Sequence, residues 1–237
     1  SVTLITDRIV DLRCVDAAEP LCTVTLRKNG GNNRYSQSNI DRWLGSAAAA
    51  GAWYAPAHAT DQPPDSASVC FNGTAYAARP GFLHRFTEAE RARLLETTIR
   101  ILPNPAYDDG IASEDIVRRV FLPSMSEVGK ATEENEPPYP WPGLSASDSA
   151  RSCLLAQPVF DNTLSDQKPS TADVAWVWWG RTQRRDSPNS LCTISASGKA
   201  LSDAARRGKV GVRPAINLSA GTPLTPQPDA SGCYSIV

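Results

Sequence analysis

The sequence predicts a loop-rich chain of the α+β class, with a mostly β chain as the alternative. Proline (19 residues) and glycine (15 residues) are frequent among the 237 residues, and both interrupt regular elements. Continuous helical patterns are few, whereas short stretches rich in β-branched and aromatic residues recur. A chain of this length can bury a sizeable core as one large domain or two small ones.

The N-terminal third predicts strands, one helix and a long loop. Residues 3–15 are rich in Val, Ile, Leu and Thr with partial alternation, which is typical of one or two strands. A helix is expected over 36–51, because Ser36 or Ser38 can cap its start. Its inward face would carry Ile40, Trp43 and Leu44. Residues 56–80 contain repeated prolines and little periodicity, so they are expected to form an ordered loop.

The clearest helical pattern spans residues 87–99. Thr87 and Glu90 have the spacing of a capping box, in which each residue's side chain satisfies the other's backbone N–H. The residues expected to face the core are Leu94, Leu95 and Ile99.

The middle of the chain alternates short elements with loops. Residues 118–124 predict a short apolar strand, and residues 124–129 predict one helical turn. The acidic, proline-rich segment 131–143 is expected to be an exposed loop, and 146–157 a short helix.

Three strands are expected near the C-terminus, at 174–182, 191–198 and 210–218. Apolar stretches at both ends of this region enclose a polar run with little apolar content.

Simple packing explains the large side chains of these strands. Trp176 and Trp178 would lie on one face of the first strand and Trp179 on the other, since side chains alternate along a strand. Arg181 and Arg213 are expected to form buried ion pairs or to donate to loop carbonyls, because a guanidinium offers five donors.

Charge and hydropathy argue against several functional classes. The net charge of −1 gives no global attraction to nucleic acid or to a membrane surface. No run approaches the roughly 18 apolar residues that a transmembrane helix needs, so we expect no membrane insertion.

No sequence motif marks a catalytic or metal site. A nucleophile elbow, a phosphate-binding loop and an HExxH zinc motif are all missing from the sequence. His58 with Asp61 could form an acid–base pair, although ordinary hydrogen bonds of a loop histidine are favoured. Asp108, Asp109 and Gly110 read as a turn, with a calcium loop as the alternative. Glu133, Glu134 and Glu136 read as a solvated acidic loop.

The cysteines give little support for a zinc cluster. None forms a CxxC pair, and both histidines are distant from them in sequence. Buried thiols are favoured slightly over disulfides. The six are Cys14, Cys22, Cys70, Cys153, Cys192 and Cys233.

Many short motifs in a fixed order resemble a large group of domains from gut phages and bacteria. That group carries a terminal WWLR(S/T)…G…GVRPA(L/I)NL pattern, which reads here as WWGRT at 178–182, Gly198, and GVRPAINL at 211–218. Gly180 and Gln183 depart from the pattern. Upstream agreement comprises DAAEP at 16–20, GNNRYSQSNIDRWL at 31–44, AAAGAWY at 48–54, DQPP at 61–64, GFL at 81–83 and VFLPSMSEVG at 120–129.

This resemblance implies one C-type-lectin-like domain over 1–237, of the formylglycine-generating-enzyme type, with a small twisted sheet, two main helices and long irregular loops. Many members are variable proteins of diversity-generating retroelements, in which a reverse transcriptase alters codons of the C-terminal strands and loops. The corresponding variable region here is 178–213. The resemblance also implies a phage virion or a bacterial cell surface as the location.

The resemblance gives the polar run a function as a binding surface. A segment that tolerates many side chains cannot also form the core, because a misplaced buried polar group costs about 1–3 kcal/mol. We expect an exposed ligand-binding face, called here the candidate surface, formed by Arg184, Arg185, Asp186, Ser187, Asn189, Ser190, Ser202, Asp203, Arg206, Arg207 and Lys209. Its four arginines would form a basic patch. Leu191, Ile194 and Leu201 would point inward between the two parts of this surface.

The chain is therefore expected to be a non-enzymatic protein that binds an unknown protein or glycan on a cell surface, without a cofactor. One alternative is an invariant lectin-like module that binds cell-envelope glycans. A second is an oxidase like the formylglycine-generating enzyme, which needs two reactive cysteines in the C-terminal part. Cys192 and Cys233 are the two that lie there.

Overall fold

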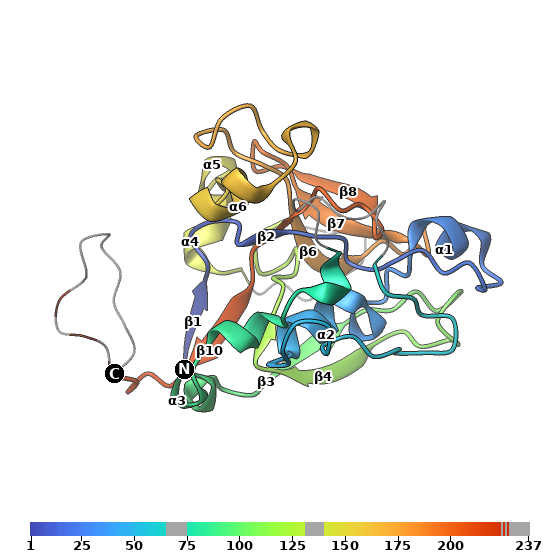
Figure 1. Cartoon of the computed structure of the whole chain (residues 1–237), viewed down its shortest axis with the longest axis horizontal. Helices are drawn as coiled ribbons and strands as arrows, with labels where there is room; N and C mark the ends of the chain where they lie inside the picture. The colour runs from blue at the N-terminus through green and yellow to red at the C-terminus, as the bar shows by residue number, and fades with distance from the viewer. Residues whose placement is uncertain (65–74, 131–139, 224, 226, 228–237) are drawn as a thin grey trace.

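The computed structural model describes residues 1–64, 75–130, 140–223, 225 and 227. It has the predicted α+β class, with small sheets, short helices and long connections between them (Figure 1). The helices are α1 (Thr25–Gly30), α2 (Asn39–Gly45), α3 (Glu88–Arg93), α4 (Pro142–Ser145), α5 (Asp148–Arg151) and α6 (Gln157–Asn162). No helix in the described ranges has the length and hydropathy needed to cross a bilayer.

The strands form three sheets. They are β1 (Val2–Ile5), β2 (Asp11–Leu12), β3 (Thr97–Ile101), β4 (Glu114–Arg118), β5 (Val120–Phe121), β6 (Trp178–Gln183), β7 (Ser190–Ile194), β8 (Ala200–Ala204), β9 (Gly211–Val212) and β10 (Ala215–Leu218). The sheet orders are β2-β9-β6-β7-β8, β1-β10-β5 and β3-β4. All pairs are antiparallel except β6 with β9.

The predicted C-terminal strand 210–218 is divided between two sheets. Its first part, β9, pairs with β2 and β6, and its second part, β10, pairs with β1 and β5. Pro214 lies between them and has no backbone N–H for a ladder, so the chain changes sheet at this point. Because β10 pairs with β1, the first and last described strands are neighbours (Figure 1).

The two tryptophans of β6 lie on opposite faces of the strand, as predicted, and pack in different hydrophobic clusters. Trp179 lies in one cluster with residues of α2, β3 and β5, and Trp178 lies in the other with residues of β7 and α6. Trp176 packs beside the second cluster, on the side of Trp178. Trp178 and Trp179 are fully buried, so strand alternation accounts for both positions.

The helices predicted at 36–51 and 87–99 begin where expected and end early. The Ser38 hydroxyl caps α2, but the helix ends at Gly45 because the following carbonyls pair elsewhere. The carbonyl of Ser46 accepts from Leu83 N (2.9 Å) and that of Ala48 from Gly81 N (3.0 Å). No described helix exceeds the seven residues of α2, so the expectation of two main helices is wrong.

The second helix has the predicted Thr87–Glu90 capping box but spans only 88–93. Its expected continuation turns into strand β3, which pairs with β4. Leu95 is half exposed instead of inward, and its N–H donates to Asn217 O (2.9 Å). The β-branched residues after Leu95 favour a strand once a partner is present.

Two other predicted elements and the inward orientation of Leu201 are corrected, and one predicted helical turn is confirmed. Residues 118–124 contribute only β5 after the end of β4, and the helix over 146–157 is reduced to α5 before α6 begins. Residues 200–204 form strand β8, so Ser202 and Asp203 of the candidate surface lie in a strand. Leu201 is 58% exposed, because its β8 side chain points away from the core. The helical turn at 124–129 is confirmed, since Val128 N donates to Ser124 O (3.2 Å).

Replacement of Trp179 by alanine should cost about 3–5 kcal/mol of unfolding free energy, because a fully buried indole leaves a large cavity. Leu201→Ala is the matched control in the same sheet and should cost under about 1 kcal/mol, since Leu201 is exposed. Urea denaturation of both variants measures the difference. Equal losses would contradict the assignment of Trp179 to the core.

Candidate functional site

The two parts of the candidate surface meet at one end of the five-stranded sheet. In the β7–β8 hairpin Ser190 pairs with Ala204, so the segment before β7 and the segment after β8 leave the sheet together. Ala205 N donates to Asn189 O (2.8 Å), and Arg206 N donates to Gly30 O at the end of α1 (2.9 Å). The shared location predicted for 184–190 and 202–209 therefore follows from strand pairing.

A single buried asparagine binds the backbone of the first segment. The Nδ2 of Asn33 lies within hydrogen-bond distance of the carbonyl oxygens of Arg184 (3.2 Å), Ser187 (2.8 Å) and Ser190 (2.9 Å). Its own N–H points to Pro188 O (3.3 Å). Asn33 is fully buried, and its Oδ1 lies 3.4 Å from Gln183 Nε2. The loop conformation is thus set by contacts to main-chain atoms.

Two further residues contact the same loop through its carbonyls. Arg27 Nε donates to Pro188 O (2.9 Å), and Asn104 Nδ2 donates to Arg185 O. Asp108 links the two, because it pairs with Arg27 (2.8 Å) and accepts from Asn104 N (2.9 Å). We call Asn33, Arg27 and Asn104 the anchor residues. The hydrogen bonds of these three residues end on main-chain carbonyls, so they do not depend on which side chains the loop carries.

The second segment is also bound through its backbone. Trp176 Nε1 donates to Lys209 O (2.7 Å), and the Tyr76 hydroxyl, which donates to Leu12 O, lies 3.2 Å from Gly208 O. Ala205 O accepts from Val15 N (2.8 Å) and Asp16 N (3.1 Å).

The side chains of the candidate surface are less exposed than the sequence predicted. Asp186, Ser202 and Arg207 are exposed. The others are half-buried: Arg184, Arg185, Ser187, Asn189, Ser190, Asp203, Arg206 and Lys209. Partial burial follows from the close contact of this end of the sheet with the 27–34 segment.

The expected basic patch is compensated in part. Arg184 forms two hydrogen bonds with Asp186 (3.0 and 2.6 Å), which lower the pKa of that carboxyl group. Arg207 pairs with Asp203 at 2.5 Å. Arg206 donates to the carbonyl oxygen of Asn29 (3.4 Å). The two ion pairs cancel their own charges, but Arg185, Arg206 and Lys209 leave the candidate surface with more basic than acidic side chains, so the predicted positive field is reduced and keeps its sign.

A shallow hollow of about 460 Å3 lies on the second segment. It is bordered by Asn29, Gly30, Gln167, Asp203, Ala204, Arg206, Arg207, Gly208 and Lys209. Four candidate residues of the second segment thus share a concave site with the end of α1, whereas no residue of the first segment lines it. Asn29 and Gln167 were missed, since nothing in their local sequence indicates this proximity.

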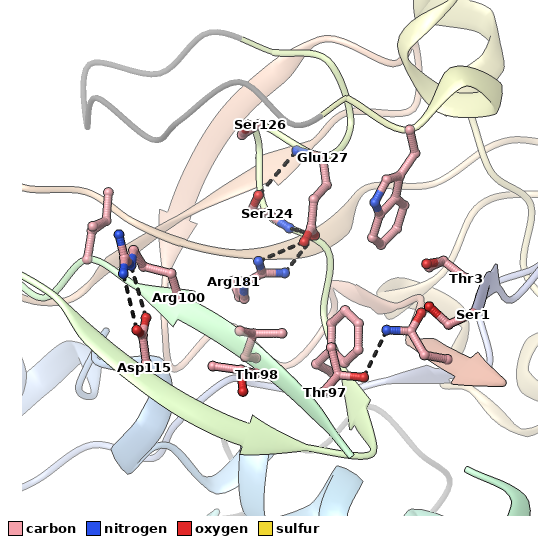
Figure 2. Close-up of a pocket in the computed structure, with 15 residues that line it drawn as sticks. Ser1, Thr3, Thr97, Thr98, Arg100, Asp115, Ser124, Ser126, Glu127 and Arg181 are labelled. Atoms are coloured by element: carbon pink, nitrogen blue, oxygen red, sulfur yellow. Dashed lines mark hydrogen bonds and ion pairs between the residues drawn. The ribbon is translucent and has the colours of Figure 1, made fainter. Parts of the chain in front are cut away.

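A second hollow, of about 500 Å3, lies between β3, β10 and the 124–127 turn. Figure 2 shows Glu127 at its floor, bound to both Arg181 and the Ser124 backbone. Arg181 is buried and also donates to Leu122 O (2.8 Å), as predicted for a structural arginine. The structural prediction for Arg213 is likewise confirmed, because its Nε donates to Thr6 O (2.8 Å).

The other residues that the sequence singled out have structural contacts. His58 pairs with Glu19 (2.6 Å) instead of Asp61, whose carboxylate accepts from Asn39 and Ala57. Glu133, Glu134 and Glu136 lie outside the described residues.

The described cysteines are thiols, as favoured: Cys14, Cys22, Cys153 and Cys192. Cys70 and Cys233 lie outside the described residues. Within the described ranges, His, Cys, Asp and Glu side chains form no group of three or more arranged for a metal ion.

Comparison with known proteins gives one family match. A family model described as a domain of unknown function (DUF6273) matches residues 1–220, a range that contains the candidate surface and all three sheets. No curated protein and no solved structure shows significant similarity to the chain.

Asn33→Ala should lower the unfolding free energy by about 2–4 kcal/mol, because several carbonyls lose a buried donor. Backbone amides over 184–190 should also exchange faster in hydrogen-exchange mass spectrometry. Asn29→Ala, on the exposed side of α1, is the control and should change neither quantity. Unchanged exchange at 184–190 in Asn33→Ala would contradict the anchoring role.

Proposed function

The chain belongs to the DUF6273 family, and we propose that it is a non-enzymatic binding protein that presents a variable C-terminal surface. The surface comprises the two segments 184–190 and 202–209. Its partner is a protein or glycan on a cell surface, and its location is a phage virion or a bacterial surface. The anchoring of both segments through main-chain atoms is the observation that carries this proposal.

A variable surface requires a main chain whose conformation does not depend on the variable side chains. If a loop's own side chains determine its conformation, each substitution changes the shape of the loop as well as its chemistry. Here the anchor residues donate to carbonyl oxygens, which every amino acid possesses. The side chains can therefore change while the main chain keeps its course, as in binding loops supported by a rigid scaffold.

The two ion pairs of the candidate surface also support the proposal that its side chains can vary. Arg184–Asp186 and Arg207–Asp203 each join two members of the candidate surface. Partly exposed pairs of this kind contribute about 0–1 kcal/mol each. Removing both partners of a pair leaves no uncompensated charge, so the scaffold does not depend on them.

We propose the C-type-lectin-like fold, of the formylglycine-generating-enzyme type, on the motif resemblance. Small sheets, short helices and long ordered connections support it. The oxidase alternative is less favoured, because Cys192 is buried in the second hydrophobic cluster and a reactive thiol must be accessible. The DNA around the gene distinguishes a variable surface from an invariant one. A diversified gene is accompanied by a reverse-transcriptase gene and by a template repeat whose mismatches fall at adenines.

A display library tests the proposal directly. Randomising Arg184, Asp186, Asp203 and Arg207 together should leave most members folded, because none of the four is fully buried and the ion pairs that they form contribute only about 0–1 kcal/mol each. Selection on several unrelated purified proteins should then yield different binders. Protease resistance measures the folded fraction, and binding titration measures selectivity.

The matched control library randomises four exposed residues of another loop, Ser170, Thr171, Asp173 and Val174. It should fold equally well but yield few binders. A mostly unfolded first library would show that the four side chains are structural. Equal yields of binders from both libraries would refute a specialised surface.

A further inference from the structure

The hollow of Figure 2 continues past Trp141 into a neighbouring one. The first has a volume of about 500 Å3 and the second about 450 Å3, and both are bordered by Thr3 and Trp141. The two volumes fall in the range of small-molecule sites. We call the pair the Trp141 groove. None of its lining residues belongs to the candidate surface, so it is a separate site.

The groove has a largely apolar lining in which the charged side chains are paired. Arg181 is paired with Glu127 at the floor (2.6 and 2.8 Å), and Arg100 is paired with Asp115 at the wall (2.9 and 3.1 Å; Figure 2). The remaining polar lining consists of hydroxyl and amide side chains: Ser1, Thr3, Thr97, Thr98, Ser124, Ser126 and Asn217. An ionic ligand would find each charge already compensated, whereas a neutral ligand with many hydroxyl groups matches this lining.

Two buried atoms of the lining residues lack hydrogen-bond partners within the described residues. Asn217 donates to Thr97 Oγ1 (2.8 Å), but its Oδ1 acceptor has no partner. Arg181 also has an unpartnered Nε donor, although its other nitrogens are bound. Buried polar atoms are nearly always satisfied, so these two unsatisfied atoms are exceptional among the lining residues.

Trp141 differs from the other tryptophans of the chain. Each of the other five donates its indole N–H to a main-chain carbonyl of a distant segment. Trp141 makes no such bond in the described part of the chain and is only half-buried, and its ring borders both hollows. An amphipathic ring in this position can pack on the apolar face of one ring-shaped unit while its N–H binds a polar group.

We propose that the Trp141 groove binds an uncharged oligosaccharide. Trp141 packs on a sugar ring where the two hollows join, and hydroxyl groups on either side bond to Asn217, Thr97 and Thr98. The paired charges at the floor orient these hydroxyl groups without attracting ions. This site is independent of the proposed function and requires no variation of its residues.

Isothermal titration of the full chain tests the proposal, with neutral hexasaccharides of glucose, mannose, galactose and N-acetylglucosamine as probes. At least one should bind saturably, with an affinity unchanged between low and high salt. Trp141→Ala should weaken that binding about tenfold or more, and Trp141→Phe should restore part of it. Lack of binding by every probe, or equal binding by Trp141→Ala, would overturn the proposal.

A threonine pair provides the control for folding. Thr98→Val removes a hydroxyl from the groove while keeping the side-chain shape, and it should weaken binding severalfold with an unchanged melting temperature. Thr171→Val makes the same change at an exposed position outside the groove and should bind as the parent does. Equal affinities of the two variants would place the sugar elsewhere. Asp186→Ser, on the candidate surface, should also bind as the parent does, which separates this site from the proposed function.

Discussion

The need to pair buried main-chain carbonyls governs this structure. Long connections cannot satisfy their own carbonyl groups as helices and sheets do, so donors must come from elsewhere. Indole N–H groups meet part of this need, as Trp179 does for Arg13 O (2.8 Å) and Trp178 for Arg151 O (2.9 Å). Arg151 itself donates to the carbonyls of Gly198, Val128 and Leu144. Each such bond joins segments that are distant in sequence, and together they make the connections ordered.

The loops of the candidate surface are held in the same way, by donors from other segments that bind their main-chain carbonyls. Asn33 donates to the loop before β7, and Trp176 donates to the segment before β9. Because the donors are outside the loops and the acceptors are main-chain atoms, these bonds do not depend on which side chains the loops carry. The binding protein that we propose needs loops with this property. The same argument explains why polar anchor residues are buried here, where an apolar core residue could not bind a carbonyl.

The hollow beside α1 and the Trp141 groove differ in chemistry because different kinds of residue line them. The one beside α1 is bordered by charged side chains of the candidate surface, so its character would change with them. The Trp141 groove is framed by strands and by the Arg181–Glu127 pair, which also supports the 122–127 turn. Substitution of Arg181 or Glu127 would disturb the scaffold, so the site that we propose there is suited to a constant ligand.

Local sequence was sufficient for features that depend on near neighbours. The caps at Ser38 and Thr87, the opposite faces of Trp178 and Trp179, and the polar run before β7 all follow from spacing along the chain. Helix ends were not predictable, because α2 stops where Gly81 and Leu83 recruit its next carbonyls. Nor was the partner of His58, which is Glu19, 39 residues away. The exposure of the surface was overestimated for the same reason: its burial comes from α1 and Asn33, and long-range contacts leave no periodic trace in sequence.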